Sequence, residues 1–159
     1  MVLTNHFINQ SLNFLKCYKG TFSCNNIPLL KECSRKMFVV NLDTTSGPGT
    51  HFIFLEINRY KCFYFDPLGN ALQNKHIKRY LSLLGVLEIK SINQQVQSVS
   101  SSACGLFCIC ILVARCFYLN WTQILSFFSK KKLVLNEKEN ILKLLNYILN
   151  KKIRVCKIS

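Results

Sequence analysis

The sequence predicts an α+β fold in which a small mixed or antiparallel sheet packs around a central buried helix. Between residues 36 and 92, short runs of branched and aromatic residues alternate with turn residues, which is typical of strands. Residues 104–118 are apolar on nearly every side, which is typical of a helix covered by other elements. A length of 159 residues without repeats or linkers favours one domain over residues 1–159.

The amino-terminal half is predicted to supply one helix and most of the strands. Residues 3–16 carry a mostly apolar face at helical spacing and predict a helix. Residues 18–28 are rich in glycine, asparagine and proline and predict a loop. The branched apolar run 36–42 predicts a buried strand, and residues 50–58 and 59–66 predict the two strands of a hairpin.

The carboxyl-terminal half is predicted to be mainly helical. Residues 74–85 form an amphipathic pattern that ends on a glycine, as helices often do. Residues 86–92 predict a further strand, and residues 104–118 form the buried helix. Residues 120–129 and 136–150 predict two more helices after it.

Nine cysteines raise the question of disulfides or metal binding. Their number is odd, their spacing is irregular, and the start of the chain lacks the pattern of a secretory signal. We therefore expect free thiols in a reducing compartment and a protein that is not secreted. Cys104, Cys108 and Cys110 lack the pair spacing of zinc sites, so we predict no metal site. Most of the cysteines are expected to pack as small core residues.

The charge balance is strongly basic, with 21 Lys+Arg against 7 Asp+Glu and a net charge of +14. Such a balance favours binding to polyanions, although solubility alone would also account for it. Two basic clusters without interleaved aromatic residues predict non-specific contact with a DNA backbone. These clusters contain Lys130, Lys131, Lys132, Lys151, Lys152, Arg154 and Lys157. No apolar run reaches the roughly 18 residues of a membrane span, so no membrane association is expected.

Cys104 lies between a loop of small residues and the predicted buried helix. At the amino-terminal end of a helix, the macrodipole and the free N–H groups stabilise a thiolate. Gly105 adds no side chain, so a substrate can approach the thiol closely. This position therefore predicts a nucleophile, whereas a thiol that only packs would more naturally lie in the middle of the helix.

A thiolate nucleophile requires a histidine to exchange its proton and a group that orients this histidine. Of three histidines, His51 is the candidate because it opens a strand after a glycine-rich turn, and the other two lie on predicted surface helices. Residues 51 and 66 fall at the paired ends of the predicted hairpin, so Asp66 can orient His51. Gln97 and the backbone N–H of Cys104 are candidate donors to an oxyanion.

The ordered phrases "GPGTHF", "CFYFDPLGN" and "QSVSSSACGLFC" resemble the adenovirus cysteine endopeptidase (adenain) family. That family has the order histidine, acid, glutamine, cysteine, with the glutamine seven residues before the cysteine. The resemblance implies that His51 is the general base, Asp66 orients it, Gln97 binds the oxyanion and Cys104 is the nucleophile. It extends from about residue 10 to residue 121.

The resemblance also implies the biological setting. It suggests a protease fold with the nucleophile at the start of the central helix. The protein would act as a monomer in virion maturation. The substrates would be viral capsid and core precursor proteins cut next to glycine, in the virion and in the host nucleus or cytoplasm. Gly49, Phe52 and Gly105 would lie against the substrate.

The chain departs from the family pattern at three points. Phe52 stands where the family usually has tryptophan, and the chain is shorter than the adenovirus enzymes. Those enzymes bind an activating viral peptide through a disulfide, but Val86 occupies the position of the cysteine concerned. We therefore predict no disulfide-linked peptide, while a non-covalent peptide or DNA stays an implied activator.

Two other interpretations stay open. SUMO- and ubiquitin-like-protein-specific proteases of the same clan use the same order of residues. They typically have aspartate before the cysteine, where this chain has Ala103, and a glutamine one residue nearer. Both differences favour the viral endopeptidase. The second alternative is a basic nucleic-acid-binding protein without enzymatic activity, for which Cys104→Ala would leave every activity intact.

Overall fold

A computed structural model describes residues 3–30, 34–128 and 133–156, with the backbone path alone at 133–135 and 151–156. The described residues form one five-stranded sheet with the spatial order β1-β2-β3-β4-β5. The strands are β1 (Tyr18–Ser23), β2 (Arg35–Asn41), β3 (Phe52–Asn58), β4 (Lys61–Phe65) and β5 (Glu88–Ile92). The central pairs are antiparallel, whereas β1 with β2 and β4 with β5 are parallel. The sheet is therefore mixed, which is one of the two alternatives that the sequence predicts.

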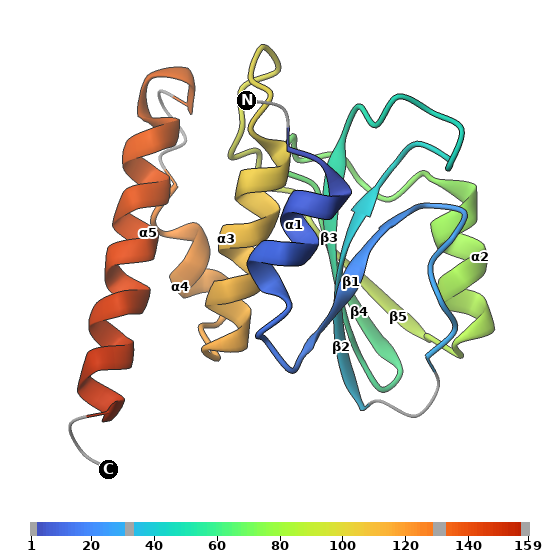
Figure 1. Cartoon of the computed structure of the whole chain (residues 1–159), viewed down its shortest axis with the longest axis horizontal. Coiled ribbons are helices and arrows are strands. Elements are labelled where there is room, and N and C mark those ends of the chain that lie inside the picture. The colour runs from blue at the N-terminus through green and yellow to red at the C-terminus, as the bar shows by residue number, and fades with distance from the viewer. Residues whose placement is uncertain (1–2, 31–33, 129–132, 157–159) are drawn as a thin grey trace.

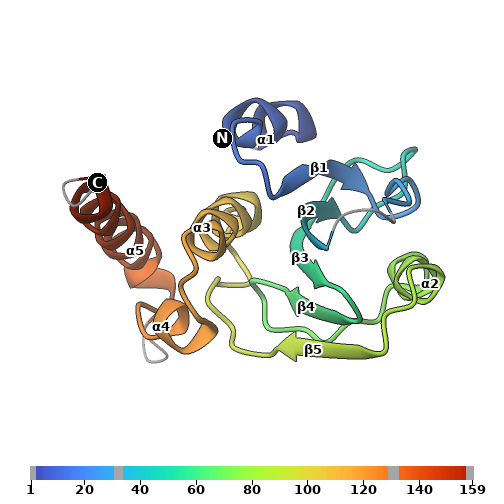
Figure 2. The same ribbon diagram turned by 90° about the horizontal axis from the view of Figure 1, so that it is seen from below.

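Helices lie on both faces of this sheet (Figures 1 and 2). In the described part of the chain they are α1 (Asn5–Leu12), α2 (Lys75–Leu83), α3 (Cys104–Cys116), α4 (Trp121–Leu125) and α5 (Leu133–Cys156). α1 and α3 cover one face and α2 covers the other, while α4 and α5 lie beyond α3. The sheet packs against one side of α3 instead of surrounding it, and α1 and α5 contact the other sides.

Capping side chains determine where two of the predicted helices begin. The Thr4 hydroxyl accepts a hydrogen bond from the N–H of Phe7 at 3.2 Å, so α1 starts after Thr4. The Asn74 side chain accepts bonds from His76 and Ile77 at the start of α2. The helix predicted over 120–129 is shorter than expected, and the one predicted over 136–150 is longer at both ends.

The strand β1 was not predicted, because residues 18–28 have the composition of a loop. Gly20 has a φ of +133° and interrupts the register with β2 at this point. The strand is nevertheless held by its parallel pairing with β2 and by Asn9 of α1. The Asn9 side-chain oxygen accepts bonds from the Tyr18 hydroxyl at 2.6 Å and from the Thr21 N–H at 2.8 Å. Tertiary contacts therefore override the local composition.

The α3 helix is the centre of the larger apolar core. Phe107, Cys108 and Ile111 of this helix are fully buried and pack against the sheet and the surrounding helices. A second core, on the opposite face of the sheet, includes Ile77 and Leu81 of α2. Within the described residues, none of the helices combines the length and apolarity that a membrane crossing requires.

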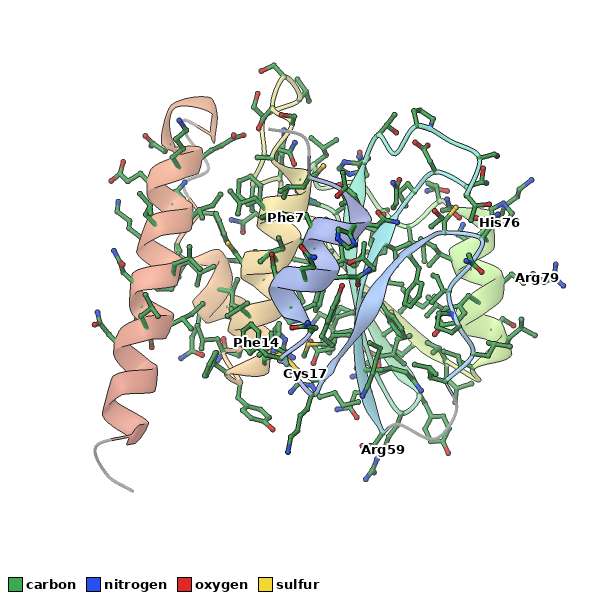
Figure 3. All side chains as sticks on the ribbon, in the orientation of Figure 1. Phe7, Phe14, Cys17, Arg59, His76 and Arg79 are labelled. Carbon is green, nitrogen blue, oxygen red and sulfur yellow. A yellow bond between two sulfur atoms is a disulfide. The ribbon has the colours of Figure 1, made fainter. Side chains whose placement is uncertain are left out.

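A disulfide joins Cys17 to Cys116, which corrects the expectation that all thiols are free. It links the chain just before β1 to the last residue of α3 (Figure 3). The two residues are 99 positions apart, and the packing of α3 against α1 and the sheet brings them together. Count and spacing along the sequence carry no information on such a contact. Five other described cysteines, Cys24, Cys62, Cys104, Cys108 and Cys110, are free and buried.

Candidate active site

A cleft of about 400 Å³ opens at the amino-terminal end of α3. Six of the residues predicted to act on or contact a substrate line it. They are Gly49, His51, Phe52, Gln97, Cys104 and Gly105. Asp66 is absent from the lining because it lies behind His51, with 1% of its surface exposed. The structure thus brings together residues from four separate segments of the chain.

His51 and Asp66 meet at the ends of two neighbouring strands. His51 immediately precedes β3 and Asp66 immediately follows β4, and these strands pair as an antiparallel hairpin. The His51 Nε2 atom lies 2.7 Å from Asp66 Oδ1. The carboxylate also accepts bonds from the Leu68 N–H at 2.8 Å and the Asn70 side chain at 3.1 Å. Asp66 is therefore held in place by bonds that do not involve the imidazole that it orients.

The loop before His51 is organised by Asp43, for which no role was predicted from the sequence. One oxygen of its carboxylate accepts bonds from the N–H groups of Thr50 at 2.7 Å and Gly49 at 2.9 Å, and from the Thr50 hydroxyl at 3.0 Å. These bonds, led by the Thr50 N–H, lower the pKa of Asp43 below its ordinary value. Gly49 has a φ of +80°, and a Cβ there would lie 2.8 Å from the Asn41 side chain. This turn therefore positions His51 at the edge of the cleft.

Cys104 is the first residue of α3 and is 7% exposed. Burial tends to raise the pKa of its thiol, but hydrogen bonds from His51 and from the N–H groups of Phe52 and Gly105 outweigh it, together with the His51 charge. The pKa of Cys104 is therefore below its ordinary value. Because His51 Nε2 contacts Asp66, Nδ1 is the ring nitrogen that is available to Cys104.

His51 is shifted in the opposite sense. Burial alone would lower its pKa, but the hydrogen bond to Asp66 and the contact with Cys104 prevail and raise the pKa to about 9. A lowered thiol pKa beside a raised imidazole pKa favours proton transfer from sulfur to nitrogen. The arrangement can therefore hold a thiolate–imidazolium pair.

Asp66→Asn is expected to lower the pKa of His51 from about 9 toward its ordinary 6.5, because the neutral amide removes the largest favourable contribution. An NMR titration of the His51 ring measures this shift. The control is Glu88→Gln, which removes one negative charge from an exposed site on β5 and should leave the titration unchanged. An unaltered His51 titration in Asp66→Asn would show that Asp66 does not hold the charged imidazole.

Gln97 reaches the cleft from the segment between β5 and α3. It is 2% exposed, and its side-chain nitrogen donates to the Ser101 carbonyl at 2.6 Å. Its side-chain oxygen is buried and has no hydrogen-bond partner among the described residues. The backbone N–H groups of Val96 and Gln97 both donate to the Pro67 carbonyl. The turn that carries Asp66 therefore also holds Gln97.

Leu3 forms part of the cleft wall, which the sequence did not indicate. A Cβ on Gly105 would lie 3.0 Å from the Leu3 side chain and 3.4 Å from the Phe52 ring. The amino-terminal segment thus packs directly beside the nucleophile. In the sequence, Leu3 is one apolar residue of a predicted helix, so its place in the cleft follows from tertiary packing alone.

The predicted DNA-binding residues stay untested. Lys130, Lys131, Lys132 and Lys157 lie outside the described residues, as do the side chains of Lys151, Lys152 and Arg154. In the described parts of the chain, no group of three or more His, Cys, Asp or Glu residues is arranged to hold a metal ion.

Residues 18–143 match the sequence pattern of the adenovirus endoprotease family. The protease of bovine adenovirus 4 is 30% identical over 123 residues, which cover 69% of this chain and 60% of that protein. The protease of ovine adenovirus D serotype 7 is 31% identical over 125 residues, with 69% and 61% coverage. The chain spans about 60% of the length of these two relatives.

A similar fold occurs in the crystal structure of an ASFV protease. The superposition has a TM-score of 0.61 at 15% identity and covers 90% of this chain and 66% of that chain. At this identity the similarity concerns the fold alone, and it confirms the fold class predicted from the sequence.

Proposed function

The chain belongs to the adenovirus endoprotease family, and we propose that it is a cysteine endopeptidase with Cys104 as its nucleophile. The observation that carries this proposal is the position of His51, between the buried carboxylate of Asp66 and the thiol of Cys104. A histidine so placed holds the proton of a reactive thiolate and donates it later.

In the proposed mechanism, the Cys104 thiolate attacks the carbonyl carbon of the scissile peptide bond. The carbonyl oxygen becomes an oxyanion, and His51 gives its proton to the leaving amine as the C–N bond breaks. Water then attacks the thioester, with His51 taking a proton from it. Sulfur leaves as the thiolate, and the proton on His51 restores the imidazolium.

The oxyanion would be bound by the Cys104 N–H and the Gln97 side-chain amide. An amide NH₂ group carries two hydrogens, and the Ser101 carbonyl accepts one of them. The second hydrogen is the proposed donor to the oxyanion. The contact with Ser101 therefore restrains the rotation of the amide without using up its donor capacity.

The proposed substrates are viral capsid and core precursor proteins, cut next to glycine during virion maturation. Support for a glycine preference comes from the walls of the cleft. Gly49 and Gly105 contribute no side chains, while Leu3 and Phe52 limit the space beside Gly105. Regulation by DNA or by a non-covalent peptide belongs to the same proposal and rests on family resemblance and on the charge of +14.

Brief treatment with iodoacetamide at about pH 6 is expected to label Cys104 in preference to the other cysteines. An ordinary thiol with a pKa near 8.5 is almost fully protonated at that pH. Burial raises the pKa of Cys62 and of Cys110 to about 12, and that of Cys108 also rises. Mass spectrometry of the digested protein identifies the labelled residue.

The matched variants are Cys104→Ser, which should lose the label, and His51→Ala, which should lose the preference for Cys104. If several cysteines of the native protein were labelled to a similar extent, this would contradict the proposed nucleophile. The same result would favour the non-enzymatic interpretation of this basic chain.

A further inference from the structure

The segment between β5 and α3, residues 93–103, carries Gln97 and is here called the oxyanion loop. It stands above the first turn of α3 in Figure 1. Within the loop, the Gln97 side chain donates to the Ser101 carbonyl at 2.6 Å, and the Ser101 N–H donates to the Ser98 carbonyl at 3.1 Å. These bonds give residues 97–101 a defined shape, but they do not fix that shape relative to Cys104.

The position of the oxyanion loop depends on bonds to other parts of the chain. The N–H groups of Val96 and Gln97 donate to the Pro67 carbonyl at 2.9 and 3.0 Å. The next N–H along the chain, that of Ser98, donates to the Glu137 side chain at 2.5 Å. Three consecutive amides are thus engaged, two by the turn that carries Asp66 and one by α5.

Among the described residues, the hydrogen bond to Glu137 is the one that joins the loop to the carboxyl-terminal helix α5. A hydrogen bond from a backbone N–H to a carboxylate is shorter and stronger than one between neutral groups. Glu137 lies in the second turn of α5 and is half-buried, whereas Glu139 faces solvent and pairs with Lys143 at 2.6 Å. Two acids on one helix therefore have different surroundings, and one of them contacts the residue next to Gln97.

We propose that Glu137 is a positioning residue, which holds the Ser98 amide and thereby sets the place of the Gln97 side chain in the cleft. This inference rests on the proposed function. Displacement of a transition-state donor by about 1 Å can cost about a hundredfold in rate. Without the carboxylate, the loop keeps its anchor at Pro67 and the bonds from the Gln94 side chain to the Leu125 and Phe128 carbonyls. It loses the bond to α5, which is the one that holds the residue next to Gln97 on its carboxyl-terminal side. Gln97 then has more than one accessible position, and fewer of them suit the oxyanion.

The test compares Glu137→Ala, Glu137→Gln and Glu139→Ala in the whole 159-residue chain. Glu137→Ala is expected to lower kcat on a glycine-containing peptide by about tenfold to a hundredfold, with KM within about twofold. Glu137→Gln keeps an acceptor oxygen and should recover most of the lost rate. Glu139→Ala removes the same charge two residues away and should match the native protein. A kcat in Glu137→Ala equal to the native value would overturn the proposal.

A second readout separates positioning from a merely structural role. Alkylation of Cys104 by iodoacetamide forms no oxyanion, so its rate should stay within about twofold in Glu137→Ala. Affinity for a peptide aldehyde, whose adduct places an oxygen at the oxyanion position, should fall in parallel with kcat. A parallel fall of alkylation and aldehyde affinity would show general damage to the site and would also overturn the proposal.

Hydrogen exchange at the Ser98 amide distinguishes failure of this inference from failure of the proposed function. Faster exchange in Glu137→Ala, and not in Glu139→Ala, reports the contact itself. If the native protein cleaves no peptide, the proposed function fails and the positioning role fails with it, even where the exchange result verifies the contact. If the native protein is active but exchange at Ser98 is the same in all variants, the inference alone is wrong.

Discussion

Replacing His51 with alanine is expected to lower kcat/KM by about 10⁴-fold or more on peptides with glycine beside the scissile bond. The variant loses the proton donor for the leaving amine. It also loses the hydrogen bond and the charge that lower the pKa of Cys104, so less thiolate is present at neutral pH. Single-turnover and steady-state assays of the variant and the native protein measure the combined loss from the missing proton donor and the smaller thiolate fraction.

The control for this variant is His76→Ala. His76 lies on α2, on the face of the sheet opposite α3 (Figures 1 and 3). Its replacement should leave kcat/KM unchanged. Activity in His51→Ala within about tenfold of the native value would contradict the assigned role, because general acid–base catalysis alone contributes about 10²–10⁴-fold.

The pH dependence of the native protein follows from the two shifts. Activity should fall as pH rises through about 9, because His51 then loses the proton that the leaving amine requires. It should also fall at low pH, where Cys104 becomes protonated.

The same shifts affect the stability of the folded protein. The raised pKa of His51 contributes fully to the free energy of unfolding below the ordinary pKa of 6.5, and this contribution is lost as pH rises through about 9. The lowered pKa of Cys104 contributes fully above the ordinary pKa of a thiol, and this contribution is lost as pH falls through the lowered pKa.

Glu56→Ala is expected to lower the free energy of unfolding by about 3–5 kcal/mol. Glu56 lies on β3, is 1% exposed, and sits between two guanidinium groups. Its carboxylate accepts from Arg115 Nε at 2.6 Å and from Arg35 Nε at 2.9 Å. Arg35 and Arg115 bind it from β2 and from the end of α3. Removing the carboxylate leaves two largely buried positive charges without their counterion.

Urea denaturation at neutral pH measures this loss, and Glu88→Ala is its control. Glu88 pairs with Lys61 at 2.8 Å, but these side chains are 57% and 46% exposed. Exposed pairs contribute less than about 1 kcal/mol, so the control should differ little from the native protein. Equal losses in the two variants would show that burial does not decide the strength of these ion pairs.

Local patterns in the sequence were sufficient to predict the α+β class and to place the candidate residues in one hypothetical active site. Cys104 could be singled out because a thiol at the start of an almost entirely apolar helix has a distinct local environment. His51 and Asp66 could be paired because hairpin geometry relates two strand ends through sequence distance alone. Their 2.7 Å contact in the structure agrees with that geometry.

Features that depend on distant packing could not be predicted in this way. The strand β1 forms because β2 and Asn9 hold a segment whose composition favours a loop. Leu3 and Glu137 come from opposite ends of the sequence, and neither carries a pattern that indicates a role at the cleft. Contacts of this kind are properties of the assembled fold, and a single sequence contains no period or motif that marks them.

The disulfide between Cys17 and Cys116 has a consequence for the covalent connectivity of the molecule. It closes a ring of the polypeptide, and His51, Asp66, Gln97 and Cys104 all belong to that ring. A single backbone cut at any point between the two cysteines would leave these four residues on one covalently continuous molecule. Leu3 and Glu137 belong to the two linear arms outside the ring, so a cut in either arm can release the support that it provides.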